Sequence, residues 1–187
     1  MDAARLAVTL YMETQVLTGF IYQPYGERLL DLLNGIFVRQ PENRGRFLKV
    51  SDITIHHPDG KKERLPTAYI NKSTIHLAAV SDGDSARGIG AEAGPKFYPF
   101  VQKSSVPIRL RTPAYALTGS TYCFSGQKIW HVLEEKLIFL PVTNARIRAA
   151  ANGISWVAPF VAVNKEQILS LQEEEIALSS SPLTRTS

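Results

Sequence analysis

Short runs in which apolar and polar residues alternate fill the first part of this chain. Val8, Leu10 and Met12 are separated by more polar residues, which is the period of two expected for a half-buried strand. After a turn at residues 14–15, residues 16–22 are rich in β-branched and aromatic side chains, which favour strands. The pattern therefore predicts two short strands joined by a turn.

A leucine-rich segment follows at residues 26–35 and ends in Asn34-Gly35. Leu, Glu and Arg favour helix, and Asn-Gly is a common C-terminal stop. We expect a short helix here, with a strand as the alternative.

Residues 47–57 lead into the turn sequence Pro58-Asp59-Gly60, which predicts a hairpin. The returning strand contains Pro66, which has no N–H for a ladder and so requires an edge or a bulge. A tight turn at Asn71-Lys72 and a last strand through Ile75 to Val80 complete the unit.

The same order of features recurs in the second half of the chain. Identical residues keep their order and spacing in the two copies, except for an insertion at residues 35–46 of the first copy. The repeated positions expected to define the fold are Gly19, Tyr22, Gly26, Asn71 and Lys72, with Gly119, Tyr122, Gly126, Asn164 and Lys165 in the second copy. A glycine inside a strand marks a bulge, a bend or a close backbone approach. We expect both tyrosines to pack over the gap that the glycines leave, with base stacking as the alternative.

About five short strands and one short helix or long loop in each copy predict a mainly β protein of two tandem small barrels. The expected divisions are a first barrel at 1–80, a Gly/Ala/Ser-rich linker at 81–105, a second barrel at 106–171 and a disordered tail at 172–187. The order of elements resembles the SH3-like and Sm-like barrels. In the Sm-like family an Asp and an Asn in one loop and an Arg-Gly pair line the RNA site. At the place of that Arg-Gly pair, this chain has Asn71-Lys72 in the first copy and Asn164-Lys165 in the second.

Residues 26–34, followed by residues 47–52, also resemble a bacterial domain family of unknown function. That resemblance implies no activity.

Composition limits the class of protein. The 187 residues are 44% hydrophobic and 20% charged, as in ordinary globular proteins. No apolar run approaches the roughly 20 residues of a membrane helix, and residues 1–8 do not resemble a signal peptide. A single cysteine, Cys123, cannot form an internal disulfide. We expect a cytoplasmic protein without a membrane partner.

The net charge of +4 is unevenly distributed. Acidic residues gather at 173–175, and basic residues gather in the second half of the first copy: Arg39, Arg44, Arg46, Lys49, Lys61, Lys62 and Arg64. These side chains are either a partner or nucleic-acid face or solubilising residues on loops and hairpin edges.

Candidate catalytic and metal-binding groups are few. His56-His57 point to opposite faces of a strand. His131 has helical spacing to Glu134 and Glu135, but Asp31 and Asn34 stand at these places in the first copy. Cys123 has no histidine placed beside it by the sequence, and the glycines of the linker do not follow a strand as a phosphate-binding loop requires. We therefore expect no catalytic residue, metal or cofactor.

The leading hypothesis is a non-enzymatic binding or assembly protein whose partner is another protein or a second copy of itself. The alternative is an Sm-like single-stranded nucleic-acid binder in which a few chains close a ring, each filling two positions. A third hypothesis is an enzyme with an unrecognised site.

Overall fold

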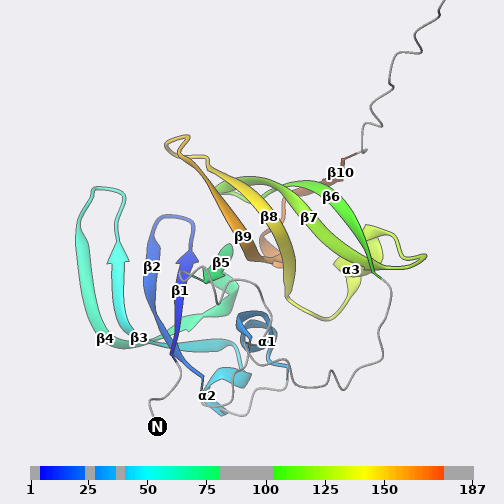
Figure 1. Cartoon of the computed structure of the whole chain (residues 1–187). Helices are drawn as coiled ribbons and strands as arrows, with labels where there is room; N and C mark the ends of the chain where they lie inside the picture. The colour runs from blue at the N-terminus through cyan, green and yellow to red at the C-terminus, as the bar shows by residue number, and fades with distance from the viewer. Residues whose placement is uncertain (1–4, 24–27, 37–40, 81–102, 175–187) are drawn as a thin grey trace, which may run out of the picture.

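Ten strands pair in antiparallel fashion into one sheet. The computed structural model of the protein describes residues 5–23, 28–36, 41–80 and 103–174. The strand order is β10-β6-β7-β8-β9-β5-β1-β2-β3-β4, so the sheet is open, with β10 at one end and β4 at the other (Figure 1). The prediction of a mainly β protein is confirmed, and the division into two SH3-like barrels stays a prediction.

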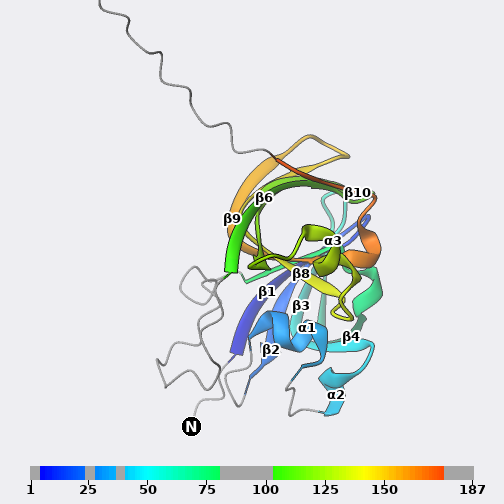
Figure 2. The same ribbon diagram turned by 90° about the vertical axis from the view of Figure 1, so that its right-hand side faces the viewer.

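The strands fall into two series along the chain. The first half contains β1 (Arg5–Tyr11), β2 (Val16–Tyr22), α1 (Leu29–Asn34), α2 (Pro41–Arg44), β3 (Phe47–His56), β4 (Lys62–Asn71), the 3₁₀ turn η1 (Lys72–Thr74) and β5 (Leu77–Val80). The second half contains β6 (Lys103–Arg111), β7 (Tyr115–Phe124), α3 (Ile129–Glu134), β8 (Phe139–Ala149), β9 (Ser155–Asn164), the 3₁₀ turn η3 (Lys165–Gln167) and β10 (Ser170–Glu173). Figure 2 shows how strongly β6 and β9 curve in the second half.

Strand neighbours and registers match between the halves. The sheet contains the orders β5-β1-β2-β3-β4 and β10-β6-β7-β8-β9. Leu10 pairs with Leu17 as Leu110 pairs with Leu117, and Leu10 faces Ala78 as Leu110 faces Leu171. Positions that share a place in these registers are called equivalent below.

The glycines inside β2 and β7 sit at strand irregularities. The β2–β3 register shifts between Thr18 and Phe20, on either side of Gly19. A Cβ at Gly19 would lie 2.7 Å from Val50 Cγ1 and 2.9 Å from the Ser51 carbonyl oxygen. Gly119 has the same shift and equally close neighbours. The predicted close backbone approach is confirmed.

Pro66 on β4 lies opposite an irregular residue of β3. Asp52 has a φ of 51°, which is the left-handed region, and the flanking pairs Ser51↔Thr67 and Ile53↔Leu65 put Pro66 opposite it. Asn144, with a φ of 50°, repeats the arrangement opposite Pro159. Each proline therefore lies where the ladder is irregular, so its missing N–H disturbs little.

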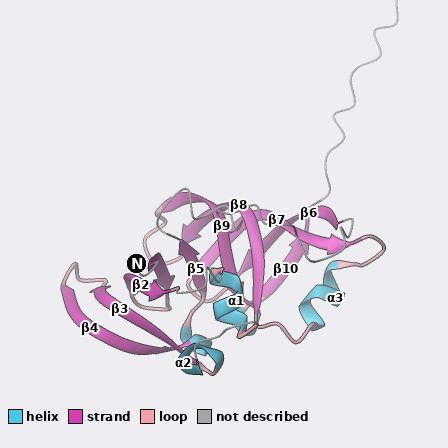
Figure 3. Ribbon diagram, turned by 60° about the horizontal axis from the view of Figure 1, so that its bottom comes forward, coloured by secondary structure: helices cyan, strands magenta, loops and turns pink. Residues whose placement is uncertain are grey.

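The leucine-rich segment is helical, which settles the alternative between helix and strand. Leu29, Leu32 and Leu33 are buried, and Gly35 ends α1 in the left-handed conformation, with a φ of 68°. Glycine adopts this C-cap geometry without a Cβ penalty. Figure 3 shows α1 in the middle of the molecule, α2 beside the start of β3, and α3 on the right.

In each half, the asparagine of the repeated Asn-Lys pair caps a 3₁₀ turn, and the lysine binds the C-terminal end of a helix. Asn71 Oδ1 accepts the Ser73 N–H, and Asn164 Oδ1 accepts the Glu166 N–H. The buried Lys72 ammonium donates to the carbonyl oxygens of Leu32 and Asn43, 2.7 Å from each. Its counterpart Lys165 donates to the carbonyls of Val132, Leu133 and Glu135. Cations at helix C-termini satisfy free carbonyls and favour the helix dipole, which explains why both copies carry lysine here.

Two of the expected boundaries need correction. β6 begins at Lys103 rather than Val106, because residues 103–105 already pair with β7. β10 ends at Glu173 rather than Leu171, because Gln172 and Glu173 pair with Arg109 and Ile108. No helix in the described ranges is long and apolar enough to cross a membrane.

Candidate binding surfaces

The two halves join through the edges of β5 and β9. Leu77 pairs with Val163, and Ala78 pairs with Ala162. The Asn164 N–H extends this pairing by donating to the His76 carbonyl oxygen at 3.0 Å. We call this contact the internal junction.

Side chains of the internal junction come mostly from positions at which the two halves differ. Tyr11 stacks on Trp156, with ring centroids 5.1 Å apart, and Tyr115 meets both rings edge-on. The Tyr115 hydroxyl donates to the Met12 carbonyl oxygen at 2.9 Å, and burial raises the pKa of Tyr115 to about 12. Sequence reasoning missed this cluster because it followed the repeated residues.

Polar groups also bind across the internal junction. Asn34 at the end of α1 donates from Nδ2 to the Phe139 carbonyl oxygen and accepts the Phe139 N–H through Oδ1, at 3.2 and 2.7 Å. Asn164 Nδ2 donates to the carbonyls of Lys72 and Ile75 in η1 and the residue after it. His76 is buried, lies 3.3 Å from the Thr112 hydroxyl, and has a pKa lowered by burial. The junction is therefore a largely buried, hydrogen-bonded interface.

At the two ends of the sheet, large apolar side chains are exposed, whereas the residues at the equivalent positions in the internal junction are buried. Phe47 is 47% exposed, whereas its equivalent Phe139 is 1% exposed. Tyr69 on β4 is 58% exposed and occupies the position of the fully buried Ala162. At the other end, Leu169 is 69% exposed and is equivalent to His76, which is 3% exposed.

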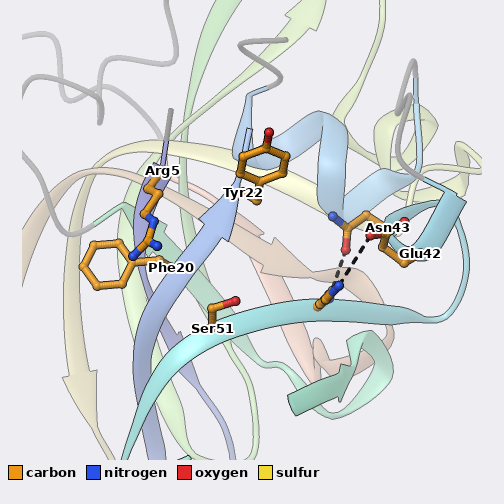
Figure 4. A pocket seen from close by; sticks show the side chains of 7 residues that line it. Arg5, Phe20, Tyr22, Glu42, Asn43 and Ser51 are labelled. Atoms are coloured by element: carbon orange, nitrogen blue, oxygen red, sulfur yellow. Dashed lines mark hydrogen bonds and ion pairs between the residues drawn. The ribbon is translucent and has the colours of Figure 1, made fainter. Parts of the chain in front are cut away.

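A pocket of about 240 Å³ lies between β1, β2, β3 and α2 (Figure 4). Its lining includes the aromatic rings of Phe20 and Tyr22 and the basic side chains of Arg5 and Lys49. Acids neutralise both cations, since Arg5 lies 3.0 Å from Asp52 and Lys49 lies 3.6 Å from Glu42. The buried Asn43 closes one side and accepts the Lys49 N–H at 2.9 Å.

The predicted basic residues fall into two groups. Arg44, Arg46 and Lys49 lie at α2 and the start of β3, while Lys61, Lys62 and Arg64 lie at the opposite end of the β3–β4 hairpin. Thr54, the partner of Arg64, lies five positions after Lys49 along β3, which is about 16 Å at strand spacing. Lys61 also pairs with Asp59 at 3.0 Å, and Arg39 lies outside the described residues.

Tyr22 and Tyr122 do not pack over the glycines. Both are exposed, and the space above Gly19 and Gly119 is filled from β3 and β8. The expectation that these tyrosines serve packing was wrong, because the neighbouring strand itself approaches each glycine. Gly26 lies outside the described residues, and Gly126 has a φ of 84°, as a turn glycine does.

The remaining candidate groups are placed as follows. His56 contacts the Thr18 hydroxyl, His57 lies 3.7 Å from Glu63, and His131 stacks on Trp130. Cys123 is buried, and this burial raises the pKa of its thiol. Within the part of the chain that the structure describes, no three His, Cys, Asp or Glu residues are grouped as a metal site would require.

Comparison with family models, curated proteins and solved structures finds no match for this chain. The function must therefore be inferred from the surfaces themselves.

Proposed function

We propose that this protein is a non-enzymatic binding or assembly protein that holds a protein partner at the open edges of its sheet. The observation that carries this proposal is the exposure of Tyr69 and Leu169 at strand edges whose equivalents are buried in the internal junction. An open strand edge offers unpaired N–H and C=O groups, and adding a strand to it is a common mode of protein recognition. Exposed aromatic side chains beside such an edge add apolar contact area.

Two features of the edges agree with a specific partner rather than with unspecific aggregation. β4 carries Lys62, Glu63 and Arg64 along its first half, and such charges discourage unspecific pairing. The apolar residues Tyr69 and Ile70 lie at its other end, next to Asn71. The edge therefore combines a charged part with a short apolar part.

The experiment is affinity capture from the source lysate, with and without nuclease, by the wild-type chain, Tyr69→Asp and the control Ile154→Asp. Ile154 is also an exposed apolar residue, but it lies at the β8–β9 turn. We expect the wild-type chain to capture proteins that remain bound after nuclease treatment. Tyr69→Asp should no longer capture them, and Ile154→Asp should capture them as the wild type does. Captured proteins that all disappear on nuclease treatment would contradict the proposal.

A second candidate function is single-stranded nucleic-acid binding at the pocket beside Tyr22. Exposed Phe20 and Tyr22 beside Arg5 and Lys49 form a set of groups that could stack a base and contact a phosphate. The neighbouring acids Asp52 and Glu42 weaken this candidate, because they repel phosphate. A salt titration of binding, with Tyr22→Ala and Lys49→Ala as variants, tests it: a steep salt dependence that Lys49→Ala flattens would favour it.

A further inference from the structure

We infer that the partner at these edges is a second copy of this chain, bound head to tail, with β4 of one chain against β10 of the next. This inference rests on the proposed function and names its partner. It follows from the internal junction, where the chain already pairs a strand equivalent to β4 with a strand equivalent to β10.

The internal junction gives the geometry. β9 is equivalent to β4, and β5 is equivalent to β10, because they hold the same places in the two strand orders. The pairs Leu77↔Val163 and Ala78↔Ala162 correspond to Ser170↔Ile70 and Leu171↔Tyr69 between chains. The Asn164 N–H bond to His76 corresponds to an Asn71 N–H bond to the Leu169 carbonyl.

The side chains at the free ends suit this contact. Tyr69, Ile70 and Phe47 would meet Leu169 and Leu171, so that exposed apolar surface from both ends is covered at once. Asn71 anchors η1 through Oδ1 as Asn164 anchors η3, so its Nδ2 is placed to donate to η3 of the next chain.

Charge complementarity appears where the junction has its aromatic stack. Glu63 is equivalent to Trp156, since Ile55 pairs with Glu63 as Ile147 pairs with Trp156. Arg111 is equivalent to Tyr11, since Arg111 faces Ser170 as Tyr11 faces Leu77. The Tyr11–Trp156 contact would therefore be replaced between chains by an ion pair of two exposed side chains, Arg111 and Glu63.

Such a contact is heterologous, because each chain uses a different surface on each side. Repeating it gives a ring if the rotation closes and a filament if it does not. One variant can then disable one end and leave the other end intact.

The test is sedimentation velocity on the full chain over a range of concentrations, with thermal unfolding to verify that each variant folds. We expect the wild type to sediment above the 20.7 kDa monomer in a concentration-dependent way. Tyr69→Asp and Leu169→Asp should each be monomeric alone, and their mixture should form a one-to-one dimer through the intact β10 edge of the first and the intact β4 edge of the second. Ile154→Asp should behave as the wild type.

Charge reversal gives an independent readout that leaves the apolar contacts in place. Glu63→Arg and Arg111→Glu should each weaken association by about tenfold, and the double variant should recover it. A wild-type chain that stays monomeric up to about 100 µM, where weak association is still detectable, would overturn the inference. So would edge variants that still oligomerise alone or stay monomeric when mixed. If the monomer nevertheless captured nuclease-resistant proteins through Tyr69, head-to-tail assembly would be wrong and the proposed function would stand.

Discussion

Replacing Gly19 with alanine tests the account of the bulge in β2. The added Cβ would lie 2.7 Å from Val50 Cγ1, about 1 Å inside the usual separation of carbon atoms of 3.5–4.0 Å. It would also lie 2.9 Å from the Ser51 carbonyl oxygen, which belongs to the backbone of β3 and cannot rotate away. The strands would have to separate locally.

The expected cost follows from these contacts. Overpacking of this kind destabilises by about 1–3 kcal/mol, and the smaller entropy of the unfolded alanine chain offsets about 0.4–1 kcal/mol. We expect a net loss of about 1–2 kcal/mol for Gly19→Ala and a similar loss for Gly119→Ala, where the equivalent distances are 2.7 Å and 2.8 Å. For a chain of this size, that is a fall in melting temperature of about 2–8 °C.

Thermal and urea unfolding measure the effect, and Gly45→Ala is the matched control. Nothing lies within 4 Å of a Cβ built on Gly45, so this change should be neutral or slightly stabilising. If both bulge variants were as stable as the control, the close approach would have no energetic role.

Three further predictions concern the buried Lys72 ammonium, the internal junction and nucleic-acid binding. Lys72→Met leaves the carbonyls of Leu32 and Asn43 without the ammonium and should cost about 1–3 kcal/mol in a urea melt, more than Lys165→Met, whose site is less buried. Burial lowers the pKa of Lys72 from 10.5 to about 8, so between these pH values the unfolded state holds more protons. The wild type should therefore gain stability relative to Lys72→Met as pH rises from 8 until tyrosines ionise. If the free energies of unfolding of the two proteins changed with pH in the same way, this prediction would be wrong. Asn34→Ala should destabilise by about 1–3 kcal/mol in calorimetry, because the Phe139 N–H and carbonyl each lose a hydrogen-bond partner; an unchanged unfolding free energy would argue against the junction contact. Filter binding should give a dissociation constant for single-stranded RNA no tighter than about 10⁻⁴ to 10⁻⁶ M at physiological salt, and submicromolar binding would favour the nucleic-acid alternative.

Local features of the fold could be predicted because each depends on nearby residues. The helix at residues 29–34 follows from leucine content and a Gly35 cap, and the irregular strand follows from Gly19. The need of Pro66 for an irregular ladder likewise follows from its missing N–H. In each case the residue type limits the backbone directly.

The pairing of β5 with β9 could not be predicted, because it joins residues far apart in sequence by backbone groups that every residue has. Trp156 and His76 gave no signal as single residues, and their equivalents are the unrelated Glu63 and Leu169. A comparison of repeated positions at which one copy is aromatic and the other is charged would have indicated this surface. Lys72 was expected as part of a turn, and its role at a helix end depends on the tertiary placement of α1.

Hydrogen–deuterium exchange of the full chain at low and high concentration tests most directly whether β4 and β10 are the binding edges. The account predicts that residues 62–71 and 169–173 gain protection as concentration rises, while the β8–β9 turn near Ile154 exchanges at the same rate throughout. Exchange in β4 and β10 that stayed constant over the whole concentration range would contradict it.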